Sequence, residues 1–357
     1  MTTIAVIGCG QWGPNHIRNF NSLLGSRVAA AVDTDPARLA RVRGLFRDVA
    51  CSTDYRTVLQ DPAVDAVVIS TPLKTHYELT REALLAGKHV LCEKPLCETA
   101  QHAEALVQLA AETQRVLMVG HVFLFNPGII KLKELVEAGE LGRLHYLLAI
   151  RTNLGPIRDD CNAAYDLASH DVSIFNWLLG REPLRVSASG GCFLRPKIED
   201  VVSITLHYPG NVFASIQCSW LNPKKVRHIT VVGSRKMLTW DDLDLSAPVA
   251  CYDKGADFKQ EYNDFGEFLR VATWDGEVRL PKVEWEEPVR KQARHFLEAV
   301  SRGFVERSDG MFSVGVVRVL EAIAESLSLG GAPTDLARGR AAAASLRSDG
   351  GPVRLQS

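Results

Sequence analysis

The segment Gly8-Cys9-Gly10-Gln11-Trp12-Gly13 constrains the fold more than any other feature of this sequence. It follows the apolar run 3–7 and opens a segment with helical patterning, and Asp33 ends the next apolar run, 28–32. Glycines at these spacings permit a tight turn, close approach of the backbone to a pyrophosphate and tight packing of the helix, whose N-terminal N–H groups favour an anion. A lone glycine-rich turn would carry little weight, but a strand, a helix and an acidic residue in order predict a dinucleotide site.

Asp33 also bears on which dinucleotide binds. A carboxylate at the end of this strand can accept hydrogen bonds from the hydroxyls of the adenosine ribose, whereas it would repel a 2′-phosphate. The sequence therefore favours NAD over NADP. Arg38 could offset the charge of Asp33, or it could be an ordinary solvated helix residue.

The first 120 or so residues continue in the same alternating pattern. Apolar runs at 65–70, 89–92 and 116–119 alternate with helical patterning at 37–46, 76–86 and 99–114. Apolar strands joined by helical crossovers are typical of a parallel sheet covered on both faces. We expect residues 1–122 to form a Rossmann NAD-binding domain in an α/β protein.

Beyond Leu141-Gly142 the pattern changes to a strand, an amphipathic helix and then successive strands. The expected strands are 144–151, 184–192, 200–208, 212–220, 226–232 and 237–240, and the helix is 164–179. Strands joined by short turns indicate an open, mainly antiparallel sheet in an α+β domain, which we place at 123–335. Helices at 289–301 and 312–329 close this substrate-binding domain and could pack back on the first one, and 336–357 is expected to be a frayed tail.

An open sheet face would be an apolar surface that needs a partner, so a homodimer or homotetramer through that face is expected. The aromatic residues of the second domain are expected in the core or between subunits; they are Trp177, Trp220, Trp240, Trp274 and Trp285.

Composition excludes several classes of function. The 41 basic and 42 acidic residues give a net charge of -1, so neither nucleic acid nor a membrane surface is an expected partner. No apolar run approaches the roughly 18 residues that span a bilayer, and the first residues do not resemble a signal peptide, so a cytoplasmic location is expected. The eight cysteines form no Cys-x-x-Cys and are expected to be reduced, and the histidine spacings indicate no metal.

Two short motifs could carry chemistry. Glu93-Lys94-Pro95 follows the run 89–92, at the carboxyl edge of the parallel sheet, where ligands of such folds bind; a plain surface turn is the alternative. Asp166 and His170 are four residues apart, hence on one face of the expected helix, where they could form an orienting carboxylate and a general base. A structural histidine and a capping aspartate are the alternative.

Taken together, the motifs of this sequence resemble those of the Gfo/Idh/MocA oxidoreductases. The resemblance covers nearly the whole chain, and its motifs are the glycine segment, Ser70-Thr71-Pro72 with His76, Glu93-Lys94-Pro95, Gly120-His121 with Asn126-Pro127, and Asp166 with His170. It implies NAD(P)-dependent oxidation or reduction of sugars, cyclitols and their derivatives. Segments 151–158, 162–171 and 219–227 resemble the branch of UDP-N-acetylglucosaminuronate 3-dehydrogenases and amino-sugar oxidoreductases, with Ser169 in place of that branch's usual proline.

The resemblance also implies roles for individual residues. Lys94 would bind the reacting oxygen, His170 would be the general base, and Asp166 would orient it. The implied cofactor contacts are Gly8, Gly10, Gln11, Trp12, Gly13, Asp33, Ser70, Thr71, Pro72, His76, Glu93 and Lys94, with Asn15 nearby. The implied substrate contacts are Asn126, Arg151, Asn153, Arg158 and Asn162, although Arg158 could equally be a surface ion-pair partner.

The leading hypothesis is an NAD-dependent dehydrogenase that oxidises a secondary hydroxyl, expected at C3, of a nucleotide-linked sugar, amino sugar or aminoglycoside. The alternatives are a glycosidase that oxidises C3 transiently and recycles its NAD, a ketosugar reductase running in reverse, and a non-catalytic dinucleotide sensor. Retention of both Lys94 and His170 argues against the sensor, because a sensor needs no base.

Overall fold

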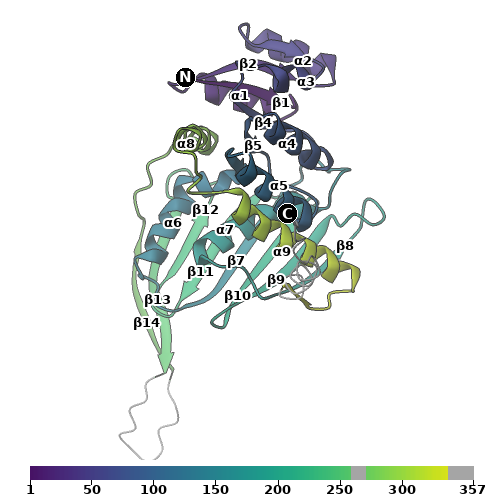
Figure 1. Ribbon diagram of the computed structural model, residues 1–357. Helices are drawn as coiled ribbons and strands as arrows, with labels where there is room; N and C mark the ends of the chain where they lie inside the picture. Colours follow the sequence, from purple (N-terminus) through teal and green to yellow (C-terminus); the bar gives the residue numbers. More distant parts are fainter. Residues whose placement is uncertain (259–270, 337–357) are drawn as a thin grey trace, which may run out of the picture.

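The computed structural model describes residues 1–258 and 271–336, and its N-terminal part is built on a parallel sheet (Figure 1). The six strands lie in the order β3-β2-β1-β4-β5-β6. They are β1 (Thr2–Ile7), β2 (Ser26–Val32), β3 (Ala50–Ser52), β4 (Ala66–Ile69), β5 (His89–Cys92) and β6 (Leu117–Val119). From β1 the chain adds β2 and β3 on one side of the sheet and then β4, β5 and β6 on the other. A crevice therefore opens between the carboxyl ends of β1 and β4, where ligands of such sheets bind.

Helices connect these strands and cover both faces of the sheet. They are α1 (Gly13–Asn21), α2 (Pro36–Leu45), α3 (Arg56–Gln60), α4 (His76–Leu85) and α5 (Ala100–Glu112). All four residues of β4 are buried, which explains why this strand is a continuous apolar run in the sequence. The predicted parallel α/β arrangement is confirmed, whereas β3 and α3 were missed because they span only 3 and 5 residues.

The second sheet has nine strands in the order β14-β13-β12-β11-β7-β10-β9-β8-β15. They are β7 (Leu144–Thr152), β8 (Arg185–Gly191), β9 (Val201–Tyr208), β10 (Val212–Ser219), β11 (Val226–Gly233), β12 (Met237–Asp241), β13 (Val249–Phe258), β14 (Val271–Arg279) and β15 (Thr334–Asp335). The sheet is mainly antiparallel as predicted, but its central pair, β7 and β10, is parallel. These two strands are far apart in the chain and are joined by a crossover rather than by a hairpin.

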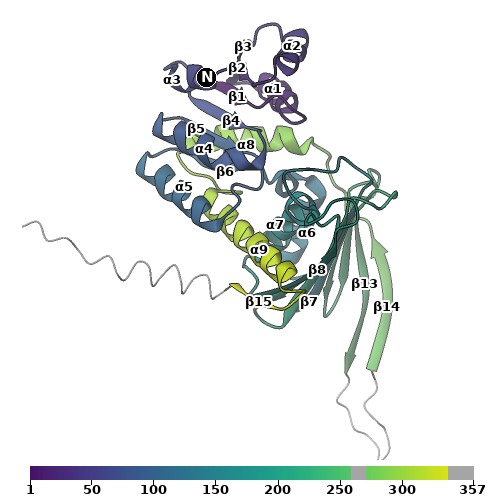
Figure 2. The ribbon, with the colours of Figure 1, turned by 90° about the vertical axis from the view of Figure 1, so that its right-hand side faces the viewer.

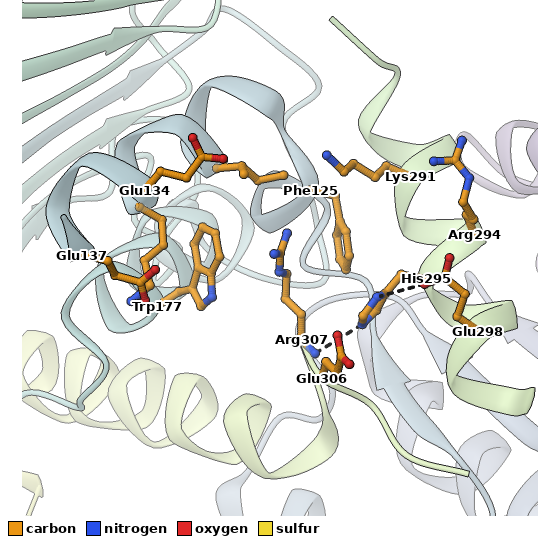
Figure 3. Close-up of a pocket in the computed structure, with 12 residues that line it drawn as sticks. Phe125, Glu134, Glu137, Trp177, Lys291, Arg294, His295, Glu298, Glu306 and Arg307 are labelled. Atoms are coloured by element: carbon orange, nitrogen blue, oxygen red, sulfur yellow. Dashed lines mark hydrogen bonds and ion pairs between the residues drawn. The ribbon is translucent and has the colours of Figure 1, made fainter. Parts of the chain in front are cut away.

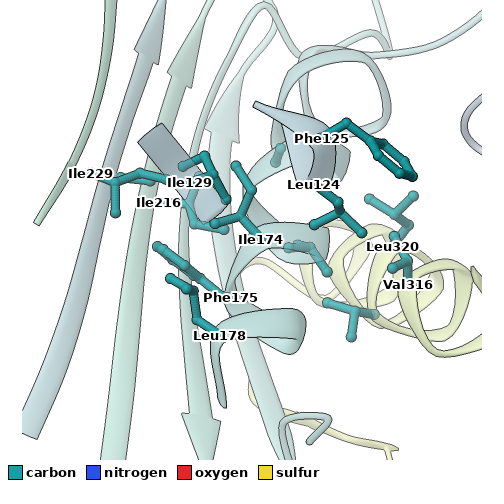
Figure 4. Packing of buried hydrophobic residues seen from close by; sticks show 14 of the residues in the cluster. Leu124, Phe125, Ile129, Ile174, Phe175, Leu178, Ile216, Ile229, Val316 and Leu320 are labelled. Atoms are coloured by element: carbon teal, nitrogen blue, oxygen red, sulfur yellow. The ribbon is translucent and has the colours of Figure 1, made fainter. Parts of the chain in front are cut away.

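Helices cover only one face of this second sheet (Figure 2). They are α6 (Pro127–Glu137), α7 (Ser169–Leu179) and α9 (Gly310–Ser328), together with the short helix η2 (Val122–Phe125). Figure 4 shows Phe175 and Leu178 of α7 packed between the sheet residues Ile216 and Ile229 and the remaining helices. Burial of such side chains stabilises the fold by about 1.5–3 kcal/mol each.

The other face of the nine-stranded sheet carries no helix within residues 1–258 and 271–336. Tyr146 of β7 and Phe213 of β10 lie on it with their rings stacked, 5.5 Å between centroids, and they are 37% and 44% exposed. Exposed stacked rings on a flat sheet are typical of a surface that associates.

The C-terminal helices bring the chain back to the first sheet. Helix α8 (Pro288–Arg302) packs against α1, where Arg18 Nη1 donates to Glu287 at 2.9 Å. Farther on, Ser308 exchanges hydrogen bonds with Val119 of β6, at 2.9 and 2.6 Å. Residues 337–357, most of the expected tail, lie outside the described residues, and none of the helices described here is long and apolar enough to cross a membrane.

The tryptophans of the second domain differ in burial. Trp220 and Trp240 are buried in the core as expected. Trp285 is 70% exposed on the segment before α8, so it is not part of the core of this chain, and its expected burial between subunits stays a prediction. All eight cysteines are free, as predicted.

Candidate active site

The glycine segment between β1 and α1 has a shape that only glycine permits. Gly8 has a φ of +97°, and a Cβ there would lie 2.5 Å from the Ser70 carbonyl oxygen. A Cβ on Gly13 would lie 2.1 Å from the Gly8 carbonyl oxygen, so Gly13 lets α1 pack tightly on the turn. A Cβ on Gly10 would have no atom closer than 4.0 Å, so this position is open to a ligand. The cradle fits a pyrophosphate at the N-terminus of α1.

Asp33 follows β2 and is held by backbone N–H groups. Its carboxylate accepts from Cys9 N at 2.7 Å and from Asp35 N at 2.9 Å, and Arg38 Nη1 lies 3.5 Å away. The carboxylate is therefore fixed beside the glycine cradle, as a partner for ribose hydroxyls requires. Arg38 lies next to it, as one of the two sequence readings allowed.

A pocket of about 670 Å³ extends from the cradle to the helix-covered face of the second sheet. It brings together most of the residues singled out from the sequence: Gly10, Gln11, Trp12, Ser70, Thr71, Pro72, His76, Glu93, Lys94, Asn126, Arg151, Asn153, Arg158, Asp166 and His170. Gly8, Gly13, Asp33 and Asn162 do not line it. Gly8 and Gly13 shape the turn of the cradle, the Asp33 carboxylate accepts from Cys9 N beside it, and Asn15 Nδ2 donates to the Gln11 carbonyl oxygen at 3.1 Å.

Lys94 lies at the carboxyl end of β5, before a cis peptide bond to Pro95. Its Nζ donates to the backbone carbonyl oxygen of Asp166 at 2.7 Å and lies 3.6 Å from the Asp166 carboxylate. The side chain is only 10% exposed. The ammonium group is therefore held in one place at the junction of the two sheets.

Asp166 lies in a π-helical turn, η3 (Ala164–Ala168), that precedes α7. Its carboxylate accepts from Trp220 Nε1 at 3.1 Å and lies 3.5 Å from Arg158 Nη1, in addition to its contact with Lys94. The structure does not show the expected hydrogen bond to His170, whose Nδ1 has no partner among the described residues. The wider winding of a π-helical turn changes the offset of residues four apart, and Asp166 contacts Lys94 instead.

His170 lies at the start of α7 with its ring edge-on to Phe123, 4.8 Å between centroids. Burial, together with the positive charges of Lys94, Arg151 and Arg227, lowers the pKa of His170 well below its usual range. The imidazole is therefore neutral at pH 7 and able to accept a proton. In contrast, burial raises the pKa of the Cys161 thiol in the same pocket to about 12, so it is not a thiolate nucleophile at neutral pH.

Glu93 and His76 line the cofactor side of the pocket. Burial opposes ionisation of Glu93, but the hydrogen bond from His16 and the charges of His16 and Lys94 lower its pKa overall. His16 Nε2 is 2.8 Å from Glu93 Oε1. His76 lies within 2.9 Å of the carbonyl oxygens of Pro95 and Thr71, and burial lowers its pKa. His76 therefore lies between the Thr71 loop and the loop that carries Lys94, and its neutral ring, which has one N–H, donates to one of the two carbonyl oxygens at a time.

Three of the expected substrate residues already have hydrogen-bond or ion-pair partners within the protein. Arg151 is buried and makes a bidentate ion pair with Asp171 at 2.7 and 2.8 Å, so it packs rather than reaching out. Arg158 pairs with Asp160 at 2.7 and 2.8 Å, which raises its pKa. Asn162 donates to Glu199 at 2.7 Å and lies outside the pocket, so the structure does not support it as a ligand.

Asn126 and Asn153 line the pocket as expected. Asn126 caps α6 through Gly128 N, at 2.9 Å, and donates to Asp242 Oδ1 at 3.1 Å. The Asn153 backbone N–H bonds the Ser219 carbonyl oxygen at 3.0 Å, which places this residue in the pocket wall.

Sequence reasoning missed several residues of this pocket: His16, Arg227, Asp242, Gln292 and Trp285. Arg227 pairs with Asp242 at 2.8 Å, and the charge of Arg227 contributes to the lowered pKa of His170. Gln292 comes from α8, is 1% exposed, and its Oε1 has no hydrogen-bond partner within residues 1–258 and 271–336. The position of His16, on α1 just after the glycine segment, and the place of Arg227 within segment 219–227 were the sequence signals for this set.

Comparison with known proteins agrees with this geometry. Residues 2–121 match the model of an oxidoreductase family with an NAD-binding Rossmann fold, and residues 129–239 match the Gfo/Idh/MocA C-terminal domain. A structure described only as an oxidoreductase, from Magnetospirillum magnetotacticum MS-1, is 30% identical, with a TM-score of 0.76, and the match covers 90% of this chain and 99% of that one. GenD2 from gentamicin A biosynthesis, solved in complex with NAD, is 26% identical, with a TM-score of 0.78, and the match covers 94% of this chain and 96% of that one.

Among curated relatives, Inositol 2-dehydrogenase 2 of Saccharopolyspora erythraea is 32% identical over 223 residues, which is 60% of this chain. The match spans 65% of the length of that relative.

The fold and the pocket combine an NAD-binding Rossmann domain with a C-terminal domain on a mainly antiparallel sheet, as in the two matched family models. The chain belongs to the Gfo/Idh/MocA family.

Proposed function

We propose that this protein is an NAD-dependent dehydrogenase that oxidises a secondary hydroxyl of a sugar or cyclitol to a ketone. The observation that carries the proposal is the shared pocket, in which Lys94 and His170 lie beyond the glycine cradle. A cation at the reacting oxygen can stabilise the developing alkoxide, and a neutral imidazole can accept the hydroxyl proton, so the two groups together suit alcohol oxidation. The names of the relatives, inositol and aminoglycoside-pathway proteins among them, support this class of substrate.

The catalytic roles follow from the charge state of each group. His170 is neutral at pH 7 and would accept the hydroxyl proton through an imidazole nitrogen. The Lys94 ammonium would donate a hydrogen bond to the same oxygen and stabilise the negative charge that develops on it. Bound NAD would supply the acceptor for the hydride that leaves the carbon. The Asp33 carboxylate would hold its ribose, and the cradle from Gly8 to Gly13 would hold its pyrophosphate.

Asp166 would position Lys94 rather than orient His170. Its carbonyl oxygen accepts from Lys94 Nζ at 2.7 Å, and Trp220 donates to its carboxylate. An ammonium held this way loses little conformational freedom when the substrate oxygen arrives, which lowers the barrier.

The narrower proposal is oxidation at C3 of a nucleotide-linked sugar, amino sugar or aminoglycoside. The segments around Arg151, Asp166 and Trp220, together with the likeness to GenD2, support it. A cyclitol is the second candidate, favoured by the inositol dehydrogenase among the relatives. The physiological direction stays open, because the same residues would serve ketone reduction.

The test is a screen of nucleotide sugars, aminoglycosides and inositols for NADH formation. Accumulation of NADH together with a ketone product supports net oxidation. Glycoside cleavage without accumulation of NADH would instead indicate a glycosidase that recycles its cofactor.

The uncovered sheet face supports a further part of the proposal, a homodimer or homotetramer. Tyr146 and Phe213 would be buried in such an assembly. Sedimentation of the purified protein tests it, and Tyr146→Arg should shift the protein toward monomer. Division of the chain at residues 122/123 and a cytoplasmic location also stay predictions.

A further inference from the structure

A second cavity lies on the other side of helix α8 from the candidate active site. Its volume is about 480 Å³, and its walls come from η2, α6, α7, α8 and the segment that follows α8 (Figure 3). Helix α8 contributes Val289 and Gln292 to the active-site pocket but Lys291 and His295 to this cavity. The two cavities share this helix and no lining residue.

Arg307 is a half-buried cation in the wall of this cavity. Its Nη1 donates to the Leu124 carbonyl oxygen at 2.9 Å, and its guanidinium faces the rings of Trp177 and Phe125 at 4.7 and 5.5 Å. Within the described residues it has no ion pair, and burial lowers its pKa. The two ring faces, the carbonyl oxygen and the charges of Glu306 and Glu137 compensate the burial of this cation only in part, since its pKa is lowered overall.

Lys291 is the second cation of the cavity without an ion pair in the described part of the chain. Figure 3 shows its ammonium and the Arg307 guanidinium directed into the same hollow. The other basic residues here are already paired, Lys133 with Glu137 at 3.1 Å and Arg294 with Glu286. The lining glutamates also have cations nearby, since Glu306 accepts from Arg302 at 2.9 Å and Glu134 pairs with Lys131.

We infer that this cavity binds a small organic carboxylate between Arg307 and Lys291, with the apolar part of the ligand against Phe125 and Trp177. A guanidinium matches the geometry of a carboxylate, and an ammonium adds a point charge from the other side. Glu134, Glu137, Glu298 and Glu306 also line the cavity, so a monoanion fits better than a phosphate dianion. The ligand would be distinct from both the dinucleotide and the polyol of the proposed reaction.

The experiment titrates benzoate, with benzyl alcohol as the uncharged control, into protein saturated with NAD, by calorimetry. We expect benzoate to bind and benzyl alcohol to bind at least about tenfold more weakly, the difference expected for a charge-assisted hydrogen bond. Lys291→Gln and Arg307→Gln should each weaken benzoate binding by about tenfold or more. Lys282→Gln, which removes a lysine 87% exposed and outside the cavity, should leave binding unchanged.

Failure of the wild-type protein to bind benzoate would overturn the inference, as would equal affinity in Lys291→Gln. The Lys291 variant is decisive if Arg307→Gln does not fold, because the Lys291 side chain makes no hydrogen bond or ion pair with the described residues that the substitution would remove. Equal binding of benzoate and benzyl alcohol would also overturn it, since the charge would then play no part.

Discussion

Lys94 and Asp166 are joined across the two sheets by a hydrogen bond of 2.7 Å from the ammonium to a backbone carbonyl oxygen. Lys94 follows strand β5 of the parallel sheet, and Asp166 lies in the π-helical turn that precedes α7 in the second domain. The contact therefore links the cofactor half of the pocket to the substrate half.

The hydrogen bond from Trp220 to Asp166 predicts a measurable effect on turnover. Trp220→Phe keeps the buried ring but removes the Nε1–H donor, so kcat should fall about tenfold while NAD affinity is unchanged. Trp240→Phe is the matched control, because Trp240 is equally buried and its Nε1 has no hydrogen-bond partner in the part of the chain that the structure describes. Equal kcat values for the two variants would remove Trp220 from the positioning of Lys94.

Asp33 predicts a preference for NAD over NADP. Its carboxylate would bind the ribose hydroxyls and repel a 2′-phosphate, although Arg38, 3.5 Å away, reduces the repulsion. Asp33→Ala should therefore bring the dissociation constants of NAD and NADP closer together. Fluorescence titration measures both constants. Tighter binding of NADP than of NAD by the unmodified protein would contradict the assignment.

The buried ion pair of Arg151 and Asp171 predicts a large effect on stability. Both side chains are at most 4% exposed, so Asp171→Ala leaves an unpaired buried cation and should cost about 3–5 kcal/mol of unfolding free energy. The double variant Arg151→Met with Asp171→Ala should recover part of that loss. Urea unfolding at pH 7.5 measures both, and a loss below about 1 kcal/mol for the single variant would show that the pair is dispensable.

Buried histidines predict that stability falls in mild acid. The pKa values of His76, His89, His121, His170 and His295 are lowered, chiefly by burial, to about 3 for His121. Below pH 6.5 the unfolded chain binds protons that the native chain does not, so stability is full above that pH and is lost as the pH falls.

For His121 alone the loss between pH 7.5 and 5.5 is about 1.4 kcal/mol. Urea unfolding at the two pH values measures it, and His121→Phe should reduce the difference. Equal stability at both values would contradict these pKa directions.

How far the sequence predicts the site differs from one residue to the next. The glycine segment, Asp33 and Lys94 are local signals, because a strand end and a turn place them without reference to distant parts of the chain. Asp166 was predicted as the partner of His170 from α-helical spacing. It lies in a π-helical turn instead, where it contacts Lys94.

The remaining pocket residues depend on tertiary packing. Gln292 reaches the pocket only because α8 packs against α1, more than 250 residues away in the sequence, as the Arg18–Glu287 bond shows. The parallel pairing of β7 with β10 likewise joins distant parts of the chain, and no local turn pattern predicts it. The same holds for Arg227, which faces the pocket only when β11 lies beside β7.

The most direct test of the proposed dehydrogenase compares turnover and NAD binding in Lys94→Ala and His170→Ala, using the substrate that supports NADH formation. Both variants should lose about 100- to 10,000-fold in kcat while the dissociation constant of NAD stays within about twofold, because the two groups act on the reacting oxygen and not on the adenosine half. Lys94→Arg should restore little, since a guanidinium differs from an ammonium in shape and reach. Turnover near that of the wild-type protein in either alanine variant would contradict the assignment of that residue to the chemistry.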